Sequence, residues 1–149
     1  MDTKNIKDIG GRSVKFENNI YIKGYSCVGG KKEGEGPLGQ CFDYISQDPY
    51  FGQFSWELAE SHMQQLALSY ALKKASLSAS DIKYIFAGDL LGQLMATSFG
   101  AGNMNIPLFG LYGACSTFGE GITLASMALD GGFAKNTVAL TSSHFAGAE

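Results

Sequence analysis

From Trp56 onward, short apolar runs alternate with segments in which apolar residues recur at every third or fourth position. The apolar runs predict buried strands, and the segments of helical period predict helices. The expected strands cover residues 84–88, 107–112 and 137–141, and the expected helices cover 56–74, 94–99 and the segment after Cys115. Strands that alternate with helices are typical of an α/β layered fold with a largely parallel or mixed sheet. The helix after Cys115 is apolar on nearly every side, so we expect it to be buried between two layers.

Two local patterns precede this alternation. Apolar and polar residues alternate on both sides of Asn18-Asn19, which predicts a β-hairpin over residues 14–22. Residues 29–39 are rich in glycine and charged side chains, which predicts a loop without regular structure. The loop lacks the Gly-x-x-x-x-Gly-Lys-Ser/Thr pattern of a phosphate-binding loop. We therefore expect a mobile surface loop or, as the functional alternative, a lid over a site.

Charge and cysteine content argue against several classes of protein. The net charge is −3, and the one basic pair, Lys31-Lys32, is followed by Glu33, so a nucleic-acid-binding surface finds no support. Three widely spaced cysteines and two isolated histidines argue against a disulfide scaffold and against a zinc site. Because the sequence shows neither a signal peptide nor an apolar run of about 20 residues, we expect a cytosolic protein, with a peripheral role at a membrane left open.

Cys115 lies where an expected strand gives way to an expected helix. Gly113 and Ala114 keep the turn slim, so that the chain can reverse tightly and present the thiol at the start of the helix. Free N–H groups and the helix dipole at such a position favour a thiolate, which suits a nucleophile or a ligand-contacting group. The alternative is a small buried apolar residue, which is the role we expect for Cys27 and Cys41.

Asp89 directly follows the expected strand 84–88. In open α/β sheets, ligands bind beyond the carboxyl ends of the strands. Because Asp89 and Cys115 both stand just beyond such ends, we expect them to line one pocket. The alternative for Asp89 is a structural role, in which its carboxylate caps the helix that follows.

Two groups of segments resemble known families. Residues 114–116, entering a helix of small residues, and residues 131–136 before an apolar strand resemble the nucleophile region of thiolase-fold condensing enzymes related to 3-oxoacyl-carrier-protein synthase III. Residues 16–18, 34–39, 56–57 and 86–91 resemble the stage V sporulation protein AD family, and this resemblance runs from about Phe16 to Glu149. It implies a thiolase-like layered fold in which residues 1–149 form the N-terminal half, with the second half absent from this chain.

The same resemblance implies a function. Members of this family are expected to bind pyridine-2,6-dicarboxylate (dipicolinate), alone or as its calcium chelate, during uptake into the developing spore. It also implies a homodimer and peripheral association with other stage V sporulation A-operon proteins at the forespore or spore inner membrane. We expect that no cofactor is required, and that calcium takes part only as the dipicolinate chelate. His62 and His144 do not match the positions of the catalytic residues of condensing enzymes, which favours a binding protein over an enzyme.

A dipicolinate site needs donors, positive potential and an apolar wall for the ring. The helix start at Cys115 would supply N–H donors, and Lys31 or Lys32 would reach in from the glycine-rich loop. Asp89 would repel a dianion, so we expect it to act through calcium bound to the ligand. An aromatic side chain near the helix start would form the wall: Tyr112, Phe109 or Phe118.

Two other functions stay open at this point. One is an acyltransferase or condensing enzyme that uses Cys115 as its acyl-thioester nucleophile, which also requires a positioned base and an oxyanion hole. The other is a structural or assembly module in which Cys115 has no chemical role.

Overall fold

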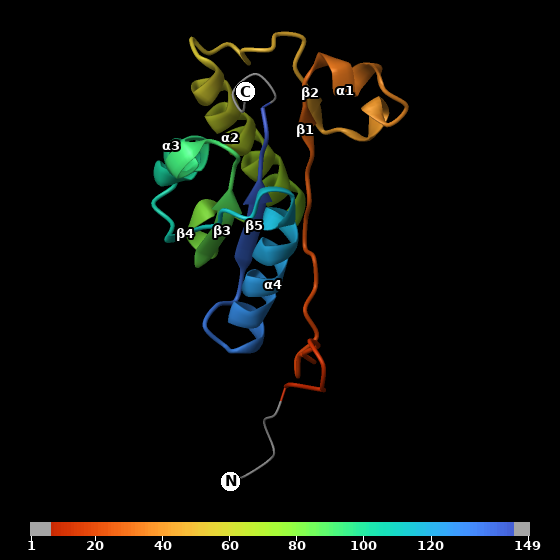
Figure 1. Cartoon of the computed structure of the whole chain (residues 1–149), viewed down its shortest axis with the longest axis vertical. Coiled ribbons are helices and arrows are strands. Elements are labelled where there is room, and N and C mark those ends of the chain that lie inside the picture. The colour runs from red at the N-terminus through yellow and green to blue at the C-terminus, as the bar shows by residue number, and fades with distance from the viewer. Residues whose placement is uncertain (1–6, 145–149) are drawn as a thin grey trace.

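The computed structural model describes residues 7–144 and contains two parallel sheets with helices packed around them (Figure 1). In chain order the helices and strands are β1 (Val28–Gly29), α1 (Lys31–Glu35), β2 (Tyr44–Ile45), α2 (Trp56–Ala75), β3 (Tyr84–Gly88), α3 (Met95–Gly102), β4 (Leu108–Gly110), α4 (Thr117–Asp130) and β5 (Thr137–Thr141). Short 3-10 turns lie at Gly39–Cys41, Ala79–Asp81, Gly92–Leu94 and Ala114–Ser116. The α/β class predicted from the sequence is confirmed.

The larger sheet has the order β4-β3-β5, and all of its pairings are parallel. Ile85 of β3 pairs with Leu108 on one side, and Phe86 pairs with Ala139 on the other. Parallel neighbours need crossover connections, which α3 and α4 provide here. Because the three strands run in the same direction, their carboxyl ends meet at one edge of the sheet. We call this the carboxyl edge.

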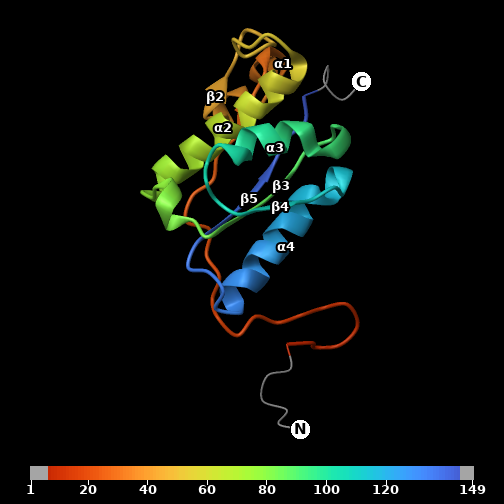
Figure 2. The ribbon, with the colours of Figure 1, turned by 90° about the vertical axis from the view of Figure 1, so that its left-hand side faces the viewer.

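The side chains of β3 alternate between two layers of helix. Ile85 and Ala87 pack into a core with Leu68 of α2 and Ala101 of α3. Phe86, which points to the opposite face, packs with residues around α4. Figure 2 accordingly shows α3 and α4 on opposite sides of the strands. Side chains along β3 alternate between the two faces of the sheet. The same alternation determines which face the residue after its end points to.

Helix α2 forms as its sequence predicts. The Ser55 hydroxyl accepts a hydrogen bond from the Leu58 N–H at 3.3 Å, which caps the first turn. Lys73 and Lys74 lie in the last turn, where cations favour the negative end of the dipole. Ser76 ends the helix in the left-handed conformation, with φ of 55°. Within residues 7–144, no helix is long and apolar enough to cross a membrane.

The hairpin expected over residues 14–22 is not formed. The segment holds only an isolated bridge between Asp8 and Val14. The backbone N–H groups of Glu17 and Asn18 donate to the Asp130 carboxylate at 3.0 and 2.9 Å. Because these donors are taken by the end of α4, the turn cannot close a hairpin, and the chain continues in extended form alongside α4 (Figure 1).

The expectation of an irregular loop over residues 29–39 is also wrong. Helix α1 forms there, because the Glu33 carboxylate accepts a hydrogen bond from the Gly30 N–H at 2.9 Å and caps the first turn. Gly39 approaches the Gly34 carbonyl so closely that a Cβ would lie 2.2 Å from its oxygen. The glycines here serve close packing rather than mobility.

Helix α4 is buried on one side only. Thr117, Gly121 and Ala125 face the sheet, whereas Phe118 is 53% exposed and Ile122 is 39% exposed. The all-round burial expected from the sequence is therefore not seen, because the sheet covers a single face of the helix. Strand β4 is shorter than expected and lies at the edge of the sheet, with Phe109 and Gly110 exposed.

The exposed face of α4 is expected to make the chain self-associate. Phe118 and Ile122 line the same hollow as the exposed Tyr21 and Ile22, so the apolar surface is continuous. Light scattering of the purified chain should detect dimers or larger species. The double variant Phe118→Ser/Ile122→Ser should shift the population toward monomer, whereas Glu120→Gln on the same helix should not. A stable wild-type monomer would contradict this expectation.

Candidate functional site

The carboxyl edge brings together the residues that follow the three strands. Asp89 follows β3, the turn with Cys115 follows β4, and Ser142 follows β5. Gly88, the last residue of β3, lies against both Leu111 and Thr117, so the end of β3 contacts the start of α4. The sequence therefore correctly predicts that Asp89 and the cysteine turn lie at the same edge.

The turn with Cys115 is held by a hydrogen bond to β3 and by hydrogen bonding within the turn itself. The Leu111 N–H donates to the Ala87 carbonyl at 2.8 Å, which extends the pairing of β4 with β3. Ala114 has φ of 49°, which reverses the chain, and the Ser116 hydroxyl donates to the Gly113 carbonyl at 2.7 Å. Cys115 lies in the 3-10 turn Ala114–Ser116, immediately before α4.

Cys115 is exposed, so the interpretation of a small buried apolar residue is wrong. Cys27 and Cys41 are exposed as well, which overturns the packing role expected for them. Among residues 7–144, no side chain forms a hydrogen bond with the Cys115 thiol. His144 directs Nε2 at the Pro49 carbonyl, 2.7 Å away. No base is therefore positioned on Cys115 by the described part of the chain.

Asp89 is buried, and both of its carboxylate oxygens accept hydrogen bonds. Oδ1 accepts from the Leu91 N–H at 2.8 Å, and Oδ2 accepts from the N–H and hydroxyl of Thr97 at 2.7 and 2.5 Å. Asp89 therefore has the structural role that was the alternative predicted from the sequence, in which its carboxylate caps the helix that follows. No group of three or more His, Cys, Asp or Glu side chains within residues 7–144 is arranged to hold a metal ion.

The structure does not place Asp89 and Cys115 in one pocket. Asp89 continues the alternation of Ile85 and Ala87, so its side chain enters the layer of α2 and α3. Cys115 instead precedes α4, which covers the opposite face of the sheet (Figure 2). The sequence predicts that both residues lie at the same edge of the sheet. It does not predict that their side chains lie on opposite faces of that sheet.

Of the other predicted ligand residues, Tyr112 lies near Cys115, whereas Lys31 and Lys32 do not. Tyr112 is 66% exposed and lies three positions before Cys115, at the start of the same turn. Lys31 and Lys32 are exposed on α1, which packs with the small sheet β1-β2, away from the start of α4 (Figure 1). Lys31 lies 3.8 Å from Glu35 on its own helix. The structure therefore keeps Tyr112 near Cys115 and does not bring either lysine there.

Sequence reasoning missed a buried polar cluster behind the carboxyl edge. We call it the Gln64 network, and it consists of five side chains: Glu60, Gln64, Asp89, Thr97 and Ser142. Gln64 Nε2 donates to the Thr97 hydroxyl at 2.9 Å and to the Ser142 hydroxyl at 2.7 Å. Ser142 in turn donates to Glu60 Oε1 at 2.6 Å. The sequence contains one indication of this network. Glu60, Gln64 and Leu68 follow one another at intervals of four residues, so they lie on the same buried face of α2.

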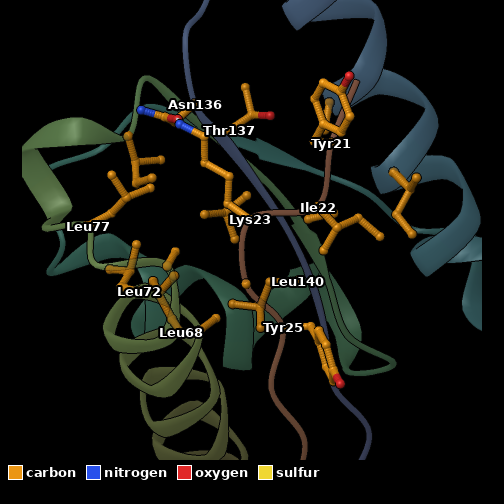
Figure 3. Close-up of a pocket in the computed structure, with 18 of the residues that line it drawn as sticks. Tyr21, Ile22, Lys23, Tyr25, Leu68, Leu72, Leu77, Asn136, Thr137 and Leu140 are labelled. Carbon is orange, nitrogen blue, oxygen red and sulfur yellow. The ribbon is translucent and has the colours of Figure 1, made fainter. Parts of the chain in front are cut away.

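A cavity of about 270 Å³ lies between the extended residues 20–26, α2, α4 and β5 (Figure 3). Its walls are mainly apolar, with Leu68 and Leu72 on one side and Tyr21 and Ile22 on another. Neither Asp89 nor Cys115 lines it. The cavity is therefore separate from the carboxyl edge.

Solved structures with a similar fold are condensing enzymes. The 3-oxoacyl-[acyl-carrier-protein] synthase III from Aquifex aeolicus VF5 aligns with a TM-score of 0.53 and 22% identity, over 58% of this chain and 30% of that one. The priming β-ketosynthase from the R1128 polyketide biosynthetic pathway aligns with a TM-score of 0.50 and 18% identity, over 57% of this chain and 27% of that one. The fold is therefore thiolase-like.

Within this class, the sequence comparisons are more specific. The family described as Stage V sporulation protein AD (SpoVAD) matches residues 10–149, and the chain belongs to this family. Stage V sporulation protein AD from Bacillus subtilis (strain 168) is 40% identical over 144 residues. That alignment covers 97% of this chain and 43% of the relative, so the chain spans less than half of the relative's length.

Proposed function

We propose that the chain acts in stage V of sporulation as part of a protein that binds dipicolinate, alone or as its calcium chelate, during uptake into the developing spore. Membership of the SpoVAD family over residues 10–149 is the observation that carries this proposal. The chain would correspond to the N-terminal half of a two-half thiolase-like protein. Homodimerisation and peripheral association with other stage V sporulation A-operon proteins at the spore inner membrane belong to the same proposal.

The start of α4 supplies chemistry that suits this ligand. Dipicolinate carries two carboxylates on an aromatic ring, so it needs N–H donors and an apolar wall. The first turn of α4 offers backbone N–H groups and the positive end of the helix dipole beside the exposed Cys115 thiol. Tyr112 is exposed at the same turn and offers an aromatic face for the ring.

Binding is favoured over acyl transfer because, within residues 7–144, no side chain is positioned to act as a base for Cys115. A cysteine nucleophile needs a positioned base and an oxyanion hole, and within residues 7–144 no side chain is hydrogen-bonded to the thiol. A direct contact between the thiol and dipicolinate requires neither group. The similarity to condensing enzymes establishes the fold only. The function has to be argued from the residues of the site.

Cys115→Ala is expected to weaken dipicolinate binding about threefold to tenfold, because a lost neutral hydrogen bond costs about 0.5–1.5 kcal/mol. Isothermal titration of the purified chain, with and without calcium, measures this change. Cys115→Trp should weaken binding more by filling the site, and Cys41→Ala should leave affinity unchanged. If Cys115→Ala binds dipicolinate with wild-type affinity, Cys115 does not contact the ligand. Acyl-coenzyme A turnover that disappears in Cys115→Ala would establish the acyltransferase instead.

A further inference from the structure

The Gln64 network contains two buried oxygen atoms that receive no hydrogen bond. Glu60 is 0% exposed and Gln64 is 1% exposed. Among the residues that the structure describes, no donor meets hydrogen-bond geometry at Glu60 Oε2 or Gln64 Oε1, although the backbone N–H of His144 lies close enough to the Glu60 carboxylate to lower its pKa. Buried polar atoms without a partner are rare and destabilising, so this pair of oxygen atoms indicates a further hydrogen-bonding group beside them.

The hydrogen-bond directions in the network exclude its own members as the missing donor. The amide of Gln64 uses both N–H groups, one for Thr97 and one for Ser142. Each hydroxyl accepts from this amide and therefore directs its own proton at a carboxylate: Thr97 at Asp89, and Ser142 at Glu60. Both orphan atoms are acceptors, so the missing group must be a donor.

A proton is the donor that the surroundings accommodate. Neither of the two cavities described in this part of the chain is lined by Glu60 or Gln64. The charged groups around Glu60 act on its anion in opposite directions, since Asp89 disfavours it and His144 favours it. Asp89 at the end of β3 adds a second carboxylate, and His144, after β5, is the nearest cationic candidate. Glu57 stands one turn earlier on α2.

We propose that Glu60 is a neutral carboxylic acid in the folded protein at neutral pH, with its proton on Oε2, and that loss of this proton at higher pH loosens the end of β5 from α2. The Ser142–Glu60 hydrogen bond joins residues 82 positions apart, at the carboxyl edge. A negative charge on Glu60 would lie near the Asp89 carboxylate. The Gln64 network contains no lysine or arginine that could neutralise it. The Ser142–Glu60 hydrogen bond would thus hold α2 and the end of β5 together in a pH-dependent way.

Burial supports this assignment, since it raises the pKa of Glu60. The Ser142 hydroxyl and the backbone N–H and charge of His144 lower this pKa, and the neighbouring Asp89 charge raises it, and the net direction is upward. The sign of the pH effect follows. Below the unfolded pKa of about 4.3, Glu60 is protonated in both states and has no effect. Above that value the unfolded chain ionises while the folded chain keeps its proton. Stability is therefore lost as the pH rises toward the folded pKa.

Glu60→Gln and Glu57→Gln form a matched pair that tests the proposal on the full chain. The pKa of Glu57 is lowered by backbone and Ser55 hydrogen bonds at the start of α2, so its shift has the opposite direction. Glu60→Gln should raise the unfolding temperature at neutral and alkaline pH and leave it unchanged near pH 4. Glu57→Gln should lower it slightly at neutral pH.

Infrared spectroscopy of the wild type provides a readout that does not depend on how the variants fold. The carbonyl stretch of a protonated carboxylic acid should persist at neutral pH and disappear in Glu60→Gln. The proposal is overturned if this band is absent at neutral pH. It is also overturned if the band titrates together with the exposed glutamates, which would mean that an ionised Glu60 is paired by an ordered water.

Discussion

Gly88→Ala is expected to destabilise the chain by about 3 kcal/mol or more, which is a large part of the 5–15 kcal/mol typical of a folded domain. A Cβ on Gly88 would lie 1.9 Å from the Leu111 carbonyl oxygen and 2.8 Å from Thr117 Cγ2. The first contact is with backbone, so no change of side-chain rotamer relieves it. Either the end of β3 or the turn after β4 must move.

The consequence reaches the candidate site. The Leu111 backbone is held by its hydrogen bond to Ala87, and Thr117 is the first residue of α4. Moving these two residues displaces the turn with Cys115 between them. Gly88→Ala should therefore impair the proposed dipicolinate binding in addition to stability, even though Gly88 offers no side chain to a ligand.

Gly119→Ala provides the matched control. Gly119 lies inside α4, and a Cβ there would meet no atom within 4 Å. Alanine is favoured over glycine in a helix by about 0.5–1 kcal/mol, so this variant should be slightly more stable than wild type. Urea unfolding followed by circular dichroism compares the two. Equal midpoints for Gly88→Ala and wild type would show that β3 and the cysteine turn do not approach so closely.

Strong local patterns were sufficient to predict the central elements of this fold. Strands β3 and β5 occupy the predicted ranges, and α2 begins at the predicted Trp56. Each of these elements combines a clear apolar period with a recognisable end signal, such as the Ser55 cap. The position of Cys115 between a strand and a helix followed from the same patterns.

Contacts between distant residues explain what the sequence could not predict. The segment at Asn18 has the pattern of a hairpin turn, but Asp130, 112 residues later, accepts its N–H groups. The buried role of Glu60 depends on Ser142, which is supplied by a different strand end. Such partners are known only once the layers are assembled.

Asp89→Asn is expected to destabilise the chain by about 2–4 kcal/mol, because hydrogen bonds to a buried charged acceptor are each worth about 1.5–3 kcal/mol. The carboxylate accepts from Leu91 N–H and from both donors of Thr97. An asparagine keeps one acceptor oxygen and turns an NH₂ group toward another donor. The start of α3 then loses its cap, and the Gln64 network loses its anchor at Thr97.

The same variant separates this structural role from the calcium role predicted from the sequence. If Asp89 is a cap, the loss in unfolding temperature should be equal with calcium dipicolinate, with free dipicolinate and without ligand. Asp81→Asn is the control, because Asp81 also accepts from a backbone N–H and a hydroxyl, both of Ser78, but is exposed. Its cost should stay below about 1 kcal/mol, since water replaces the lost contacts. A stabilising effect of calcium dipicolinate on wild type that Asp89→Asn alone abolishes would instead establish Asp89 as a ligand of the chelated calcium.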